Sequence, residues 1–179
     1  FLMSVDESFE LNTPKMLSTG DGRTTCSYFM PDNKHILYAS THEDNILCPE
    51  TPLRVNGNYV WPIYDSYDIY ISDLDGDIVN KLTNEKGYDA EATVSPKGDK
   101  IVFTSDRSGD LELYTMNIDG SDVKQITNEL GYDGGAFFSP DGNKLIFRAS
   151  RPKSKEEIDE YKRLLSEGLV KPTEMELFI

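Results

Sequence analysis

The sequence predicts an all-β fold built from repeated four-stranded sheets around an axis, a β-propeller. The first observation is a hairpin pattern that occurs three times, as FMPDNKHILY at 29–38, VSPKGDKIVF at 94–103 and FSPDGNKLIF at 138–147. In each, a turn that begins with Pro and continues with Gly or Asn joins two apolar runs. The second observation is spacing, because Pro140 follows Pro96 by 44 residues, the length of a propeller blade.

The later copies agree well beyond the hairpin, since 81–107 and 125–151 match almost position for position. Each hairpin is followed by a strand such as LELYTMNIDGS at 111–121 or DIYISDLDGD at 68–77. This combination resembles the repeat of TolB-like β-propellers, a relative of the WD-type blade, over nearly the whole chain outside two insertions. The resemblance implies about three four-stranded blades, half of a six-bladed ring. It implies no particular function, because propellers carry many.

Alignment of the copies divides the chain as one propeller segment, with a patternless tail expected before it at 1–12. The predicted parts are the last strand of a preceding blade at 14–18, blade one at 24–83 with an insertion at 42–66, blade two at 90–127, and an incomplete blade three at 135–179 with an insertion at 152–174. Three blades do not close around an axis. We therefore expect either the remainder of the same propeller or a second copy to complete the ring.

The second insertion is the one helical segment that the pattern predicts. Ser154 with Glu157 three residues later forms a capping box. Tyr161 and Leu164 fall on one apolar stripe, and Gly168 is placed to end the helix. We expect this helix to pack on the surface of the propeller.

Polar residues recur at fixed distances from the hairpin prolines. Asp89 and Asp133 stand seven residues before a proline, and Arg107 and Arg151 stand eleven after one. Because both insertions and the blade-to-blade segments reach the same rim, these residues are expected there, beside the channel mouth. They form either ion pairs that need no ligand or a polar ring that recognises a charged peptide or small ligand. Glu91, which has no acidic counterpart in the other copies, is a further ligand-binding candidate.

The first insertion contributes a group of aromatic residues in YVWPIYDSY at 59–67. Trp61 and Tyr64 are candidates for contacting a peptide or sugar, because aromatic side chains dominate many recognition surfaces. The alternative is that these rings pack the insertion onto its blade.

Composition limits the classes of partner. A net charge of −14 argues against nucleic acid, which needs a basic face, and the longest apolar runs are too short to span a membrane. Cys26 and Cys48 lack the spacing of zinc ligands. They are either separate thiols or a disulfide, and the resemblance, which implies a periplasmic or secreted protein, favours the disulfide. The alternating Asp73, Asp75 and Asp77 suggest a calcium loop, but the Asp-Gly within them is the expected hairpin turn.

Catalytic motifs such as a G-x-S-x-G elbow or H-E-x-x-H do not occur in the sequence. We therefore expect no catalytic residues, metal or cofactor in this segment. The sequence predicts a non-catalytic scaffold that binds a protein, peptide or small ligand at the insertion-bearing face. The alternative is the propeller part of a larger exported enzyme such as a peptidase or other hydrolase.

Overall fold

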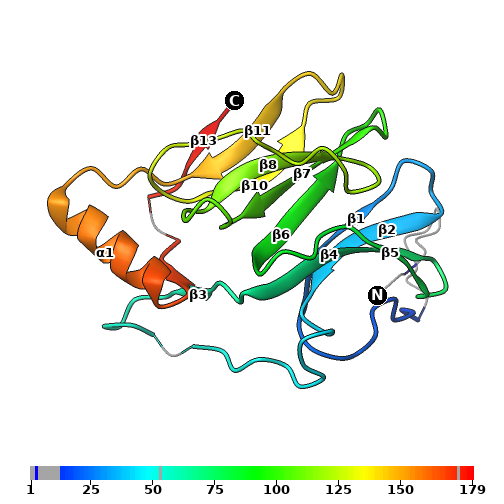
Figure 1. The fold of residues 1–179 in the computed structure, drawn as a ribbon, viewed down its shortest axis with the longest axis horizontal. Coiled ribbons are helices and arrows are strands. Elements are labelled where there is room, and N and C mark those ends of the chain that lie inside the picture. The colour runs from blue at the N-terminus through cyan, green and yellow to red at the C-terminus, as the bar shows by residue number, and fades with distance from the viewer. Residues whose placement is uncertain (1–2, 4–12, 53, 173) are drawn as a thin grey trace.

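The structure, a computed structural model, describes residues 3, 13–52, 54–172 and 174–179, and the predicted tail lies outside these residues apart from Met3. Within them the fold is mostly β-strand with a single helix (Figure 1). The elements are β1 (Thr24–Phe29), β2 (His35–Ser40), β3 (Trp61–Pro62), β4 (Ser66–Asp73), β5 (Ile78–Lys81), β6 (Gly87–Val94), β7 (Lys100–Ser105), β8 (Glu112–Asn117), β9 (Lys124–Gln125), β10 (Asp133–Phe138), β11 (Leu145–Ala149), α1 (Lys155–Ser166), β12 (Leu169–Val170) and β13 (Glu176–Phe178).

Three antiparallel units follow one another along the chain and fan out in space (Figure 1). Strands β1, β2, β4 and β5 pair in that order, as do β6 to β9, and then β10, β11 and β13. We call these blades one, two and three. A short parallel pairing of Ser66 and Tyr67 with Gly87 and Tyr88 joins blade one to blade two. The predicted all-β propeller architecture is confirmed.

The innermost strand of every blade carries a bulge at the same repeat position. The strand register shifts between Thr25 and Tyr28 in β1, and at equivalent places in β6 and β10. The residue at the shift has a positive φ in each blade, 52° at Cys26, 56° at Glu91 and 58° at Gly135. Such bulges redirect a side chain out of the sheet, so these three positions are set apart from the rest of the strand.

The apolar core lies between the faces of neighbouring blades. Leu37 and Ile69 of blade one are fully buried in a cluster that continues into blade two. In blade two the equivalent face is fully buried at Leu113, which packs against Ala136 of blade three. Leu177 holds the same repeat position in blade three and is 69% exposed.

The helix of the second insertion begins where the sequence predicts. The Ser154 side chain accepts a hydrogen bond from the Glu157 N–H, and the Glu157 carboxylate accepts one from the Ser154 N–H, which completes the capping box. Tyr161 and Leu164 are the buried residues of α1. Among the described residues, no helix is long and apolar enough to cross a membrane.

The two insertions meet each other at one rim of the propeller segment. Strands β3 and β12 pair antiparallel, with Leu169 opposite Pro62 and Val170 opposite Trp61. They lie with α1 at the left of Figure 1, away from the hairpin turns that join the first two strands of each blade. The expectation that both insertions share a rim is therefore confirmed.

The segment at 14–18 covers part of blade one. Leu17 is buried with Ile36, Tyr38 and Tyr70. Its repeat counterpart Leu82 packs in the same manner on blade two. This contact is consistent with a fourth strand contributed by a preceding blade, which stays a prediction.

Candidate functional site

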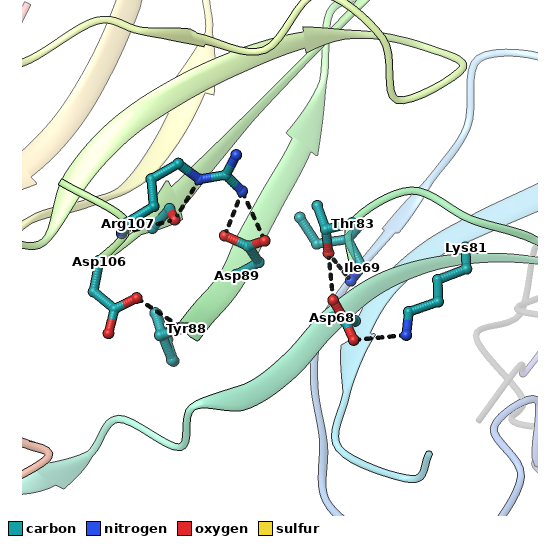
Figure 2. Close-up of polar contacts among 9 residues, drawn as sticks. Asp68, Ile69, Lys81, Thr83, Tyr88, Asp89, Asp106 and Arg107 are labelled. Carbon is teal, nitrogen blue, oxygen red and sulfur yellow. Dashed lines mark hydrogen bonds and ion pairs between the residues drawn. The ribbon is translucent and has the colours of Figure 1, made fainter. Parts of the chain in front are cut away.

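The predicted pairing of Asp89 with Arg107 is present at the junction of blades one and two. Arg107 Nη2 donates to both Asp89 carboxylate oxygens, at 2.9 and 2.8 Å, and Arg107 Nε donates to Ser105 Oγ at 3.0 Å (Figure 2). The guanidinium also lies over the Phe103 and Tyr114 rings, 5.3 and 5.2 Å from their centres. Burial raises the pKa of Asp89, while Ser105 and Arg107 oppose that rise.

The same arrangement of an aspartate, an arginine and an aromatic ring recurs in blade three. Arg151 Nη1 donates to Asp133 Oδ1 at 2.5 Å, and its guanidinium lies 5.2 Å from the centre of the Phe178 ring. Asp133 is fully buried, as Asp89 nearly is. Because the carboxylates are buried and the guanidiniums already engaged, these four residues are better suited to holding the inner strands of one blade together than to meeting a ligand. Their role in ligand binding stays a prediction.

A second carboxylate, from the third strand of the previous blade, accompanies each pair. At the first junction Asp68 accepts from Thr83 Oγ1 at 3.0 Å and lies 2.8 Å from Lys81 Nζ (Figure 2).

At the second junction the corresponding acid, Glu112, accepts from the hydroxyl of Thr127, but Gln125 takes the position of the lysine. Burial raises the pKa of Glu112 to about 7. The Thr127 hydroxyl opposes this rise, and the nearby carboxylates of Asp133 and Asp110 add to it.

Glu91 connects blade two to blade three. Its Oε2 accepts hydrogen bonds from the Gly135 N–H at 2.8 Å, the Tyr132 hydroxyl at 2.5 Å and the Thr104 hydroxyl at 3.0 Å. The bulge at Glu91 turns the side chain out of β6 toward the next blade, where Tyr132 and Gly135 donate to it, while Thr104 donates from β7 of its own blade. Its predicted role as a ligand-binding residue stays a prediction, and its hydrogen bonds give it a structural one.

Arg148 is a residue of this region that the sequence analysis did not single out. Its Nη2 donates to the Tyr132 hydroxyl at 3.2 Å and lies 3.7 Å from Glu91 Oε1. Its guanidinium stands 5.4 Å from the Trp61 ring centre and 5.8 Å from that of Tyr132. A signal was available, because blades one and two carry Ala39 and Thr104 at this repeat position. An arginine in the otherwise apolar run LIF-R-A departs from that pattern.

A cavity of about 520 Å³ opens beside Arg148 on the axial side of the blades. The three bulge positions Cys26, Glu91 and Gly135 all line it, as do the rings of Tyr28 and Phe137. This volume lies in the range of small-ligand sites, which combine apolar walls with a few polar groups. The arrangement can therefore hold a ligand, and it offers a guanidinium as the polar contact.

The aromatic residues of the first insertion divide between packing and exposure. Tyr67 is buried, and Trp61 meets the Tyr132 ring edge-on at 6.1 Å between centres. Tyr64 is half-buried, with its hydroxyl donating to the Glu50 carbonyl at 2.6 Å and Arg23 over its ring. Tyr59 is 58% exposed. Of the two predicted ligand contacts, the structure brings Trp61 to the Glu91 and Arg148 group, while Tyr64 packs against Ala39, Tyr67 and Ala90 of blades one and two.

The remaining candidates from the sequence are the two cysteines and the aspartates at 73–77. Cys26 and Cys48 are free, exposed thiols in the structure: Cys26 lines the cavity and Cys48 lies in the first insertion. A bridge between them stays a prediction for the oxidised protein. Asp73 Oδ1 accepts from the N–H groups of Asp75, Gly76 and Asp77 at 2.9, 2.9 and 3.0 Å, which gives it the role of stabilising a turn.

Comparison with known proteins agrees with this geometry. Residues 62–170 match a family model described as the TolB beta propeller domain. A putative TolB from Agrobacterium tumefaciens is 25% identical with a TM-score of 0.52, and 81% of this chain aligns with 43% of that one. TolB from Acinetobacter baumannii is 29% identical with a TM-score of 0.56, and 75% of this chain aligns with 28% of that one. The chain thus spans less than half the length of the solved structures it resembles.

Proposed function

Because this chain belongs to the TolB β-propeller domain family, we propose that it is a non-catalytic scaffold that binds a protein or peptide at the face carrying the two insertions and the channel mouth. The observation that supports this most is the pairing of β3 with β12. This pairing joins the insertion of blade one to the insertion of blade three, beside the residues that line the axial cavity. Loops fixed on a rigid sheet scaffold are where binding sites usually form.

The composition of this face fits recognition by a protein or peptide. Trp61 and Tyr132 pack with Ile63, Tyr161 and Val170 in one apolar cluster at the rim. Aromatic residues and arginine contribute most of the energy at protein interfaces, and the side chains of Tyr59, Trp61 and Arg148 are at least partly exposed on this side. The opposite rim consists of tight turns such as those at Asn33 and Gly98.

Location and assembly belong to the same proposal. Family membership supports a periplasmic or secreted location. The exposed Leu177 face of blade three supports completion of the ring by the remainder of the propeller or by a second copy. The alternative, a propeller that accompanies a hydrolase domain, concerns a domain other than this one and stays a prediction.

A peptide library tests the proposal without a known partner. Peptides selected on the purified protein should slow hydrogen exchange at residues 61–63 and 169–170. Tyr59→Ala, which changes an exposed side chain on this face, should weaken their binding. Lys97→Ala, on the opposite rim, is the matched control. Selected peptides that protect only the hairpin turns, or that bind both variants equally, would overturn the proposal.

A further inference from the structure

Arg148 is held in place by aromatic rings and keeps most of its hydrogen-bonding capacity. A guanidinium has five N–H donors, and the contacts among the described residues engage one of them, to the Tyr132 hydroxyl at 3.2 Å. The Trp61 and Tyr132 rings stabilise the charge without accepting hydrogen bonds. The side chain is 40% exposed and lines the axial cavity. The remaining donors are therefore available to a ligand.

Glu91 forms an ion pair with Arg148 but accepts no hydrogen bond from it. Glu91 Oε2 already accepts three hydrogen bonds, and the 3.7 Å between Arg148 Nη2 and Glu91 Oε1 is too long for one. The glycine at position 135 makes room for the arginine, because a Cβ there would stand 2.9 Å from Arg148 Nε. The Arg148 guanidinium thus lies next to the cavity, and most of its N–H donors have no hydrogen-bond partner among the described residues.

Apolar groups surround this cation on the axial side. The Tyr28 and Phe137 rings pack against each other with their centres 6.5 Å apart and form one apolar wall of the cavity, and Phe137 is 51% exposed. Ile146 and Leu177 also line it, but they hold positions at which blades one and two pack the next blade. The inference therefore rests on the axial residues alone.

We propose that Arg148 is the anion-recognising residue of a site for a carboxylate attached to an apolar group, as at the C-terminus of a peptide that ends in an apolar residue. The carboxylate accepts from the free guanidinium donors, and the apolar group packs against the surface formed by the Tyr28 and Phe137 rings. This inference rests on the proposed peptide-binding function and names the chemistry of its ligand. The same chemistry could come from a small aromatic acid, which the experiment separates.

Trp61, the single tryptophan of the chain, reports binding directly, because its ring lies against Arg148. Three probes are titrated at about 150 mM salt, which screens the overall negative charge: N-acetyl-Leu-Phe with a free carboxylate, the same dipeptide as its C-terminal amide, and 3-phenylpropionate. The free carboxylate should change Trp61 fluorescence with at least about tenfold lower Kd than the amide, since a charge-assisted hydrogen bond is lost in the amide. Tight binding of 3-phenylpropionate would support the chemistry and identify a small acid as its source.

Variants separate recognition from folding. Arg148→Gln should remove the preference for the carboxylate, whereas Arg163→Gln, an equal charge change on the exposed face of α1, should keep it. Arg148→Lys, with a circular dichroism spectrum matching that of the unchanged protein, checks that any loss is not unfolding. Equal affinity for acid and amide, absence of binding by all three probes, or an unchanged preference in Arg148→Gln would overturn the inference. If selected peptides still slow hydrogen exchange in the insertions, the proposed function is supported even when this inference fails.

Discussion

Replacing Glu112 by Gln removes a buried carboxylate whose repeat counterpart, Asp68, is paired with a lysine. Asp68 lies 2.8 Å from Lys81 Nζ, while Glu112 has Gln125 at that position and the carboxylate of Asp133 nearby. The amide of the variant can still accept from the Thr127 hydroxyl, as the carboxylate does. The substitution therefore removes charge and retains most of the geometry.

The pKa of Glu112 sets the size and the sign of the effect. Burial raises this pKa from 4.5 to about 7, so the folded protein holds the proton to higher pH than the unfolded chain does. The stabilising contribution is present in full below the unfolded pKa and is lost as pH rises toward 7. At ~1.4 kcal/mol per pKa unit, the rise from 4.5 to about 7 corresponds to a loss of at most about 3.5 kcal/mol, of which about 2 kcal/mol falls between about pH 5.5 and about pH 8.

Urea unfolding followed by Trp61 fluorescence measures this contribution. We expect Glu112→Gln to be more stable than the unchanged protein by up to about 3 kcal/mol at about pH 8, and to lose more than half of that advantage by about pH 5.5. Asp68→Asn is the matched control, and it should destabilise at the higher pH because it breaks the contact with Lys81. Parallel stability profiles for Glu112→Gln and the unchanged protein between these pH values would refute the reasoning.

Three further substitutions test the blade contacts and the inserted helix. Glu91→Gln weakens three hydrogen bonds to a charged acceptor and should cost about 2 kcal/mol of the free energy of unfolding in urea titrations; no change would remove Glu91 from the contact between blades. Gly135→Ala adds a Cβ 2.9 Å from Arg148 Nε and should cost more than Gly57→Ala, which shares the positive φ but has no neighbour within 4 Å; equal costs would show that Arg148 does not need the glycine. Ser154→Ala removes the N-cap of α1 and should lower stability by about 1 kcal/mol in thermal melts followed by circular dichroism, and an unchanged melt would contradict the capping assignment.

Short sequence patterns at turns and at the helix N-terminus were sufficient to predict the blades and the helix cap. The hairpin predicted at 29–38 is present, with β1 ending at Phe29 and β2 beginning at His35, and the Ser154 capping box forms as its sequence pattern requires. Both depend on turn and cap chemistry within a few residues, which a single sequence displays. Boundaries set by pairing were less accurate, since β9 spans only Lys124–Gln125 although the predicted blade two extends to residue 127.

Contacts between distant segments were the part that sequence reasoning missed. The pairing of Trp61 with Val170 joins residues more than a hundred positions apart, and neither two-residue strand has a periodic pattern of its own. Counting from the hairpin prolines found the rim pairs, but it passed over Arg148, which lies inside a strand. Its importance comes from Trp61, which belongs to another blade's insertion. Such neighbours appear only when the blades are assembled.

The central claim, that insertions from two different blades meet at one rim above the axial cavity, has a direct test. Cysteines replace Pro62 and Leu169, which are cross-strand partners in the pairing of β3 with β12, and Cys26 and Cys48 are changed to Ser. Opposed residues in antiparallel strands have Cα atoms about 4.5–5.5 Å apart, within reach of a disulfide. The account predicts a cross-link under mild oxidation for this pair and none for Pro62→Cys with Lys97→Cys on the opposite rim. Failure of the first pair to cross-link in folded protein, or equal cross-linking of both, would contradict it.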